Sequence, residues 1–218
     1  VSQLSYEVPN IATKINLLKL LLEDKDVFCR VMVFTETKKN ADRIVEKLGD
    51  YWKGELSVLH SNKAQNSRLN ALKAFKEGRT RILVASDVAA RGIDVQEVSH
   101  VINFDIPSIP EEYVHRIGRT ARAGREGTAI SFVSGKEEPR FEAIEMLISQ
   151  QIVRAELPEH LEISDLLMDE EKVQTANIVY QRGRPQGGGA FHAKSAKNSK
   201  TPQKVRMNRT KEGRRKKR

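Results

Sequence analysis

The chain has 218 residues, of which 39% are apolar and 31% are charged, a balance that suits one globular domain with additional segments. No apolar run approaches the roughly 20 residues that span a bilayer, and no leader-like block stands at the start, so we expect a cytoplasmic protein without a membrane partner. The single cysteine, Cys29, excludes an internal disulfide and a thiolate metal cluster, and we expect it to be a small core residue.

The formal net charge of +9 is concentrated near the end of the chain. Residues 182–218 carry 14 Lys and Arg against one acidic residue, whereas the preceding 181 residues carry 24 basic and 28 acidic ones. The stretch 181–218 is also rich in Gly, Ser, Asn and Pro and lacks the apolar residues of a core. We therefore predict a disordered basic tail there, of a kind that often binds nucleic acid, preceded by an acidic extension at 156–180.

Helical periodicity and short apolar runs alternate along the first 150 residues. In chain order they predict a helix at 11–23, a strand at 30–34, a helix at 37–48, a strand at 56–59, a helix at 65–77, strands at 81–85, 98–104 and 128–133, and a helix at 137–150. Strands separated by helices favour an α/β fold, with a parallel sheet covered on both faces. Ligands bind at the carboxyl ends of the strands in such sheets, so the loops after Phe34, Leu59, Ala85 and Phe104 are candidate sites.

The stretch ILVASDVAARGIDV, residues 82–95, carries polar groups directly after a predicted strand. The hydroxyl of Ser86 and the backbone N–H groups of the loop suit phosphate contact. Gly92 permits close backbone approach, and Asp94 suits a ribose hydroxyl. A capped loop with an internal Arg–Asp pair explains the same residue types equally well.

The helix predicted at 65–77 is preceded by polar residues, in the stretch LHSNKAQNSR. Such side chains at a helix start favour phosphate, but they also commonly cap helices, and both readings stay open. His60 and His115 each lack a second ligand at zinc spacing, so we predict no metal site and expect hydrogen-bonded or packed histidines.

The stretch HRIGRTARAGREG, residues 115–127, places four arginines three residues apart. This spacing brings side chains together on one side of a helical turn, where the guanidinium groups would repel one another unless an anion lay opposite. The arginines could track a nucleic-acid backbone, or they could stabilise charge on a transferring γ-phosphate. Spacing alone leaves both explanations open.

Together these loops resemble the second RecA-like domain of DEAD-box RNA helicases. Within that family they are most similar to the bacterial RhlE type. VMVFTETK at 31–38, ASDVAARGIDV at 85–95 and HRIGRTARAGREG at 115–127 are similar to motifs IV, V and VI of that family, in the same order. The resemblance covers about residues 1–150, and we take 1–155 as the RecA-like helicase C-terminal domain.

The resemblance implies a role for each matching residue. Arg119 and Arg122 correspond to arginine fingers on the γ-phosphate of ATP, and His115 to the histidine that couples the site to the partner domain. Gly92 and Asp94 join Arg119 and Arg122 in contacting ATP. The positions that match RNA-binding residues of the family are Gln65, Arg68, Ser86, Asp87 and Arg91. The family's usual glycine and aspartate after His60 are Ser61 and Asn62 here, which puts the RNA contact of that loop in doubt.

The sequence contains neither a G-x-x-x-x-G-K-[ST] phosphate loop nor a D-E-A-D motif. We therefore expect the C-terminal lobe of a longer ATP-dependent RNA helicase, inactive as an ATPase alone, with the Mg²⁺ ligands on an N-terminal RecA-like lobe. Its expected partners are RNA, that lobe, and ribosomal or RNA-degradation assemblies. Two alternatives are a stand-alone nucleic-acid-binding module and the second lobe of a DNA-acting superfamily 2 helicase.

Overall fold

The computed structural model describes residues 1–90, 95, 98–120 and 127–172. Within this part, seven strands form one sheet in the order β3-β4-β2-β5-β6-β1-β7, and every pairing is parallel. The elements are β1 (Ser2–Glu7), α1 (Ile11–Glu23), β2 (Val31–Thr35), α2 (Lys38–Leu48), β3 (Leu56–Leu59), α3 (Gln65–Lys76), β4 (Ile82–Ser86), α4 (Asp87–Ala90), β5 (His100–Asn103), α5 (Pro110–Ile117), β6 (Thr128–Val133), α6 (Glu138–Ile148) and β7 (Val153–Ala155).

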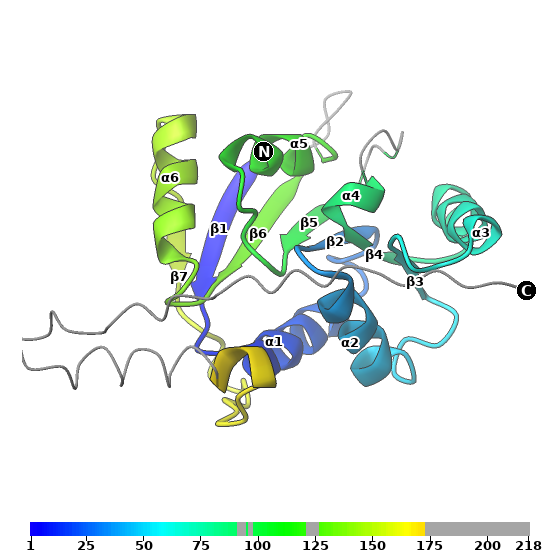
Figure 1. Ribbon diagram of the computed structural model, residues 1–218, viewed down its shortest axis with the longest axis horizontal. Helices are drawn as coiled ribbons and strands as arrows, with labels where there is room; N and C mark the ends of the chain where they lie inside the picture. The colour runs from blue at the N-terminus through cyan, green and yellow to red at the C-terminus, as the bar shows by residue number, and fades with distance from the viewer. Residues whose placement is uncertain (91–94, 96–97, 121–126, 173–218) are drawn as a thin grey trace, which may run out of the picture.

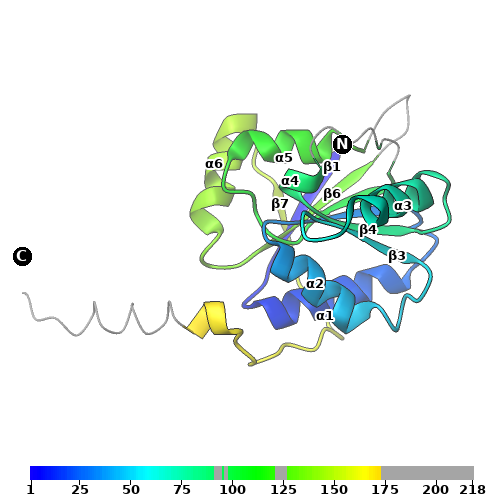
Figure 2. The same cartoon turned by 45° about the vertical axis from the view of Figure 1, so that its right-hand side comes forward.

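The sheet is the middle of three layers, which confirms the predicted RecA-like α/β fold (Figure 1). Helices α1 and α2 lie together on one face, and α3, α4, α5 and α6 cover the other (Figures 1 and 2). All five residues of β2 and of β4 are buried, because both strands lie inside the sheet and have helices on both sides. Their unbroken apolar runs are the reason that the sequence identifies them so clearly.

Local sequence signals set where the helices start. The side chain of Asn10 accepts a hydrogen bond from the backbone N–H of Thr13 at the start of α1, and Thr37 caps α2 through the N–H of Asn40 in the same way. Helix α5 begins with Pro110, which needs no backbone N–H there, and has two glutamates in its first turn. These signals fix where α1 and α2 begin, a few residues after β1 and β2, and where α5 begins, seven residues after β5 ends.

The sheet is larger than the five strands that the sequence predicts. Strand β1 pairs with β6 and β7, but its stretch SQLSYE contains only two apolar residues and gives a weak pattern. Strand β7 has three residues, too few for a periodic signal. The short helix α4 and helix α5 were also not predicted. Each of these elements depends on a neighbour supplied by the fold.

The acidic extension packs against the domain as far as the structure describes it. Leu161 is buried in the core on the α1 face, and Glu171 accepts a hydrogen bond from the backbone N–H of Ile11 at 2.9 Å. Glu170 forms ion pairs with Lys39 and Arg43 at 2.9 and 2.7 Å. This strap, residues 156–172, therefore lies along the outer side of α1 and α2 (Figure 2).

Two expectations from the composition concern the burial of Cys29 and the presence of membrane-spanning helices. Cys29 is exposed, so its prediction as a small core residue is wrong. It follows the buried Phe28 in the connection between α1 and β2, where one apolar residue suffices to anchor the chain. None of the described helices has the length and apolar character needed to cross a membrane.

Candidate functional site

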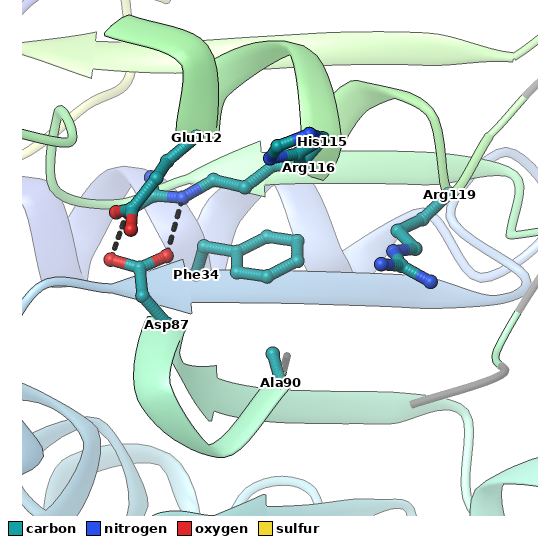
Figure 3. A pocket seen from close by; sticks show the side chains of 7 residues that line it. All are labelled: Phe34, Asp87, Ala90, Glu112, His115, Arg116 and Arg119. Carbon is teal, nitrogen blue, oxygen red and sulfur yellow. Dashed lines mark hydrogen bonds and ion pairs between the residues drawn. The ribbon is translucent and has the colours of Figure 1, made fainter. Parts of the chain in front are cut away.

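A small pocket lies where β2, α4 and α5 meet, and it gathers three of the predicted site residues (Figure 3). Helix α4 follows β4 without a connecting residue, so Asp87 stands immediately beyond the carboxyl end of that strand. The residues that line the pocket, of about 40 Å³, are Phe34, Asp87, Ala90, Glu112, His115, Arg116 and Arg119.

Arg116 anchors this pocket from inside the protein. Its side chain is 2% exposed, and its Nε and Nη2 donate to the two carboxylate oxygens of Asp87 at 2.7 and 2.6 Å. Its Nη1 donates to Asn103 Oδ1 at 3.1 Å and to the carbonyl of Asp105 at 2.7 Å. The guanidinium also lies over the ring of Phe34, 5.1 Å from its centroid. The buried charge is thus compensated by a carboxylate, two further acceptors and an aromatic face.

This arrangement corrects the expectation that the arginines share one helical face. Helix α5 ends at Ile117, so Arg116 alone of the four lies on it, and the anion opposite Arg116 is the carboxylate of Asp87. Arg119 lies beyond the end of the helix and lines the same pocket as Arg116 and the exposed His115. Arg122 and Arg125 lie outside the described residues.

The position of Arg119 is fixed from both sides. Its backbone N–H donates to the carbonyl of Arg116 at 3.1 Å, which continues the last turn of α5. Next to it, Thr120 forms a bridge with Val98, and its hydroxyl donates to the Val98 carbonyl at 2.9 Å. Arg119 therefore projects from a short turn tied to the sheet and not from a free loop.

The anchor continues across the sheet through polar side chains that sequence reasoning missed. The amide of Asn103 in β5 donates to the hydroxyl of Ser131 in β6 at 3.2 Å, and both residues are completely buried. Tyr113 of α5 donates to the side chain of Gln3 at 2.7 Å, and burial raises its pKa to about 12. In the sequence, the role of Asn103 was indicated only by its being a polar residue at the end of an apolar strand.

Three further residues that were predicted to bind RNA lie at the end of β4 and in the first turn of α3. Ser86 ends β4 and is 6% exposed, while Gln65 begins α3 and accepts a hydrogen bond from Arg68 at 3.2 Å. The interpretation in which the polar residues before α3 cap that helix is wrong, since the N-cap is Ala64 and no side chain forms a capping hydrogen bond there. Arg91, also predicted to contact RNA, and Gly92 and Asp94, predicted to contact ATP, lie outside the described residues.

Asp87 was also predicted to contact RNA, an assignment that stays a prediction. Both of its carboxylate oxygens receive hydrogen bonds from Arg116, and its side chain is 14% exposed. Asp87 therefore holds the motif containing Arg116 and Arg119 against the end of β4. The sequence allowed an Arg–Asp pair within residues 82–95. In the structure Asp87 does pair with an arginine, but this is Arg116, 29 residues away.

His60 holds the loop between β3 and α3 in place. It is 1% exposed, its Nε2 lies 2.9 Å from Asp42 Oδ1 and its Nδ1 accepts from the backbone N–H of Asn62. Burial alone would raise the pKa of Asp42, but hydrogen bonds from Lys63 and His60 lower it below its ordinary value. The expectation of a hydrogen-bonded histidine is confirmed for His60, whereas His115 is exposed. No group of three or more His, Cys, Asp or Glu side chains in the described part of the chain could hold a metal.

A larger cleft of about 690 Å³ lies between the strap and the carboxyl ends of β2, β5 and β6, and its buried charged side chains have partners within the protein. Lys14 is 2% exposed and contacts Glu137 at 2.6 Å. Burial alone would raise the pKa of Glu137, but the Lys14 ammonium lowers it below its ordinary value. Burial raises the pKa of Asp105, which accepts hydrogen bonds from Asn40. These pairs join α1, α2 and the strand ends and serve the fold.

Comparisons with known proteins agree with this geometry. Residues 13–124 match the family of the helicase conserved C-terminal domain. The DEAD-box ATP-dependent RNA helicase CshA of Bacillus cereus is 40% identical over 158 residues, which cover 69% of this chain and 30% of that protein. The chain spans about a third of the length of the curated relatives it matches.

Two solved structures share the fold. The Escherichia coli DEAD-box protein SrmB, bound to regulator of ribonuclease activity A, superposes with a TM-score of 0.69 at 35% identity, over 78% of this chain and 98% of that one. Dbp5 of Saccharomyces cerevisiae, bound to RNA and ADP BeF3, gives a TM-score of 0.65 at 31% identity, over 83% of this chain and 45% of that one. The RhlE-type subgroup stays a prediction.

Proposed function

The chain belongs to the DEAD-box helicases, as their conserved C-terminal helicase domain, and from this premise we propose that it forms the C-terminal lobe of an ATP-dependent RNA helicase. In the full-length enzyme, ATP and RNA bind between this lobe and an N-terminal RecA-like lobe. The observation that carries the proposal is the convergence of Arg119 and His115 on one pocket, beside the buried pair of Arg116 and Asp87.

In this proposal, Arg119 and His115 contact the phosphates of a nucleotide that lies largely outside this small pocket, between the two lobes. ATP bound with Mg²⁺ supplies the γ-phosphoryl group that hydrolysis removes. Arg119 carries a permanently charged guanidinium on a turn tied to the sheet, which suits a group that must meet developing negative charge in a fixed place. His115 is exposed beside it and faces the partner lobe in this proposal. Arg122, Gly92 and Asp94 complete the ATP contacts by motif resemblance.

The Mg²⁺ ligands belong to the N-terminal lobe in this proposal. The sequence has no phosphate loop to cradle the β- and γ-phosphates and no D-E-A-D motif to hold the ion. This lobe alone is therefore inactive as an ATPase. Its contribution is to complete a site that two lobes form together, which makes hydrolysis depend on their closure.

RNA lies on the neighbouring surface at Gln65, Arg68 and Ser86. A hydroxyl, an amide and a guanidinium at strand and helix ends suit the phosphate and sugar of a backbone and carry no base specificity. RNA is favoured over DNA because the CshA relative is named an RNA helicase and the Dbp5 structure holds RNA. Assemblies of RNA degradation are further candidate partners, as the complex of SrmB with a regulator of ribonuclease activity suggests.

The test uses the full-length enzyme with Arg119→Ala and Arg122→Ala. An arginine finger is worth roughly 10³–10⁵ in rate, so kcat for ATP hydrolysis should fall by at least about 100-fold in each variant while RNA affinity is largely kept. Arg79→Ala is the matched control, because Arg79 is an exposed arginine that pairs with Glu77 far from the pocket.

Two results would count against the proposal. Near-normal kcat in both finger variants would leave the arginines as a patch for the nucleic-acid backbone. Equal stimulation of the ATPase by DNA and RNA strands of one sequence would favour a DNA-acting superfamily 2 enzyme.

A further inference from the structure

A chain of buried hydrogen bonds leads from Arg116 into the sheet. Asp87 occupies Nε and Nη2 of the guanidinium, whereas Nη1 donates to Asn103 Oδ1 at 3.1 Å. The amide nitrogen of Asn103 in turn donates to the hydroxyl of Ser131 at 3.2 Å. Asn103 and Ser131 are both completely buried, so water does not replace a bond that either of them loses.

The chain returns to α5 and ends on β1. Burial raises the pKa of Tyr113 to about 12, and a side-chain hydrogen bond with Ser131 opposes that rise. A hydrogen bond that lowers the pKa of a phenol is one donated to its oxygen, so the Ser131 hydroxyl is the donor. The hydroxyl of Tyr113 donates onward to Gln3 Oε1 at 2.7 Å. Tyr113 is completely buried, and Gln3 is the first partly exposed member of the chain.

All four bonds point the same way along the chain. From Arg116 to Gln3, each group donates a hydrogen to the next. The cation sets this direction, because a guanidinium can donate but cannot accept. It also orients the amide of Asn103, since a flipped amide would put its NH₂ group against another donor. Bonds aligned in this way polarise and strengthen one another, so the loss of one weakens the rest.

This chain ties helix α5 to the interior of the sheet. Asn103 and Ser131 lie opposite each other in β5 and β6, and each of these strands has a hydrogen-bonded neighbour on both sides. Asp87, by contrast, lies on α4, a helix of only four residues. The sheet is therefore the firmer of the two supports that hold the Arg116 guanidinium.

The position of α5 decides where Arg119 projects. Tyr113, Arg116 and Arg119 follow one another at intervals of three residues, which places them near one side of the helical path. The backbone N–H of Arg119 donates to the carbonyl of Arg116 at 3.1 Å, and both side chains line one pocket (Figure 3). A shift of α5 therefore carries Arg119 with it. A misplacement of about 1 Å can cost about 100-fold in rate when the displaced group must meet a reacting atom.

We propose that Asn103 and Ser131 are positioning residues for Arg119, acting through Arg116. They touch neither ATP nor RNA, and they hold α5 where Arg119 meets the γ-phosphate. This inference rests on the proposed role of Arg119 and goes beyond it, because it assigns residues inside the sheet. A group that acts on the transition state lowers the rate when it is misplaced and leaves the affinity for ATP nearly unchanged.

The experiment measures the single-turnover rate of ATP cleavage by the full-length enzyme with RNA in excess, and the ATP concentration that gives half the maximal rate. Asn103→Leu keeps the size of the side chain and removes both of its hydrogen bonds, so the rate should fall by about 10- to 100-fold. Ser131→Ala should lower the rate by about 3- to 10-fold, and Ser131→Thr, which keeps the hydroxyl, should restore most of it. The half-maximal ATP concentration should stay within about 2-fold in all three variants.

Ser5→Ala is the matched control. Ser5 is also a completely buried serine and lies opposite Ser131 in the neighbouring strand β1, but its hydroxyl donates to the carbonyl of Val153 in β7. Its loss should leave the cleavage rate unchanged. Every rate is measured at a temperature at which circular dichroism shows the variant to be fully folded, so a loss of stability does not appear as a loss of rate.

A double-mutant cycle separates positioning from a general structural effect. If Ser131 acts through Arg119, Ser131→Ala lowers the cleavage rate in the parent and has no further effect in Arg119→Ala. The same holds for Asn103→Leu. An additive loss in the Arg119→Ala background would show that these residues support the whole site and would overturn the positioning role.

The Arg119→Ala variant alone distinguishes this inference from the function on which it rests. A strongly lowered rate in Arg119→Ala beside unchanged rates in Asn103→Leu and Ser131→Ala overturns the positioning role and leaves the finger in place. A near-normal rate in Arg119→Ala refutes the finger itself, and the positioning role with it.

Discussion

Arg116 and Asp87 form a two-armed ion pair that joins the end of β4 to helix α5 inside the protein. The bonds measure 2.7 Å from Nε to Oδ1 and 2.6 Å from Nη2 to Oδ2. The planar guanidinium matches the carboxylate geometry, which a lysine cannot do. Since Asp87 follows Ser86 and Arg116 precedes Arg119 by three residues, one buried contact fixes the segment proposed to bind RNA and the segment proposed to bind ATP relative to each other.

Breaking this pair should destabilise the protein strongly. Removing one partner of a buried pair leaves an uncompensated charge and costs about 3–5 kcal/mol, so Asp87→Asn should lower the free energy of unfolding by about that amount. Denaturant unfolding followed by circular dichroism measures the change. Arg79→Ala, which removes an exposed pair with Glu77, should cost at most about 1 kcal/mol. An unfolding midpoint for Asp87→Asn equal to that of the parent would contradict the anchoring role.

The 218-residue chain alone should not hydrolyse ATP, with or without RNA. The reason is that its sequence lacks the phosphate loop and the D-E-A-D motif. Steady-state phosphate release by the purified chain is the measurement, with a heat-inactivated sample as the blank. Adding the separately purified N-terminal lobe should restore some activity that disappears with Arg119→Ala. Turnover by the chain alone, clearly above the blank, would refute this prediction.

The basic tail should supply most of the RNA affinity of this chain. Residues 182–218 hold a net charge of +13, and the preceding residues hold −4, so the folded part attracts a polyanion weakly. Deleting 182–218 should weaken binding to single-stranded RNA and flatten its salt dependence together, by about 0.7 in log–log slope per lost contact. Phe191 is the only aromatic residue in that span, so stacking contributes little.

A rival account of the tail has it bind a protein partner or the ribosome surface. The RNA affinity would then reside in the loops around Gln65, Arg68 and Ser86. In that case truncation would leave both the affinity and the slope unchanged, and the tail prediction would fail.

Glu170 should make the attachment of the strap sensitive to acid. Hydrogen bonds from Arg43 and Lys39 lower its pKa from 4.5 to about 2, although partial burial opposes the shift. A lowered pKa in the folded state means that the contribution to stability is fully present above 4.5 and is lost as the pH falls toward 2. The stability difference between the parent and Glu170→Gln should therefore be constant near neutral pH and vanish toward the low end of that window.

Unfolding followed at a series of pH values tests this expectation. Glu159→Gln, at an exposed position of the same strap, is the matched control and should follow the parent at every pH. A difference between the parent and Glu170→Gln that persists at pH 2 would mean that the ion pairs with Arg43 and Lys39 do not carry the effect.

Much of the fold could be predicted from the sequence, because periodicity reports burial. Strands β2 and β4 are continuous apolar runs since both of their faces are covered, and α2 shows its apolar face at helical spacing. Strands β1 and β7 escaped prediction because a weakly patterned or very short segment becomes a strand only when a neighbour supplies its hydrogen bonds. The roles of the motif residues were predicted from the resemblance to motifs IV, V and VI, because residue type and spacing alone left alternatives open.

The choice of partner was decided only by the tertiary structure. The sequence did not indicate a partner for Asp87, and the fold brings it against Arg116, where the two charges compensate each other. Asn62 could have capped α3, but its side chain accepts a hydrogen bond from Lys38 of α2. The sequence determined which groups are present and which segments are buried. Residues 24 and 29 positions apart meet because the sheet order sets them side by side, and no local pattern encodes that distance.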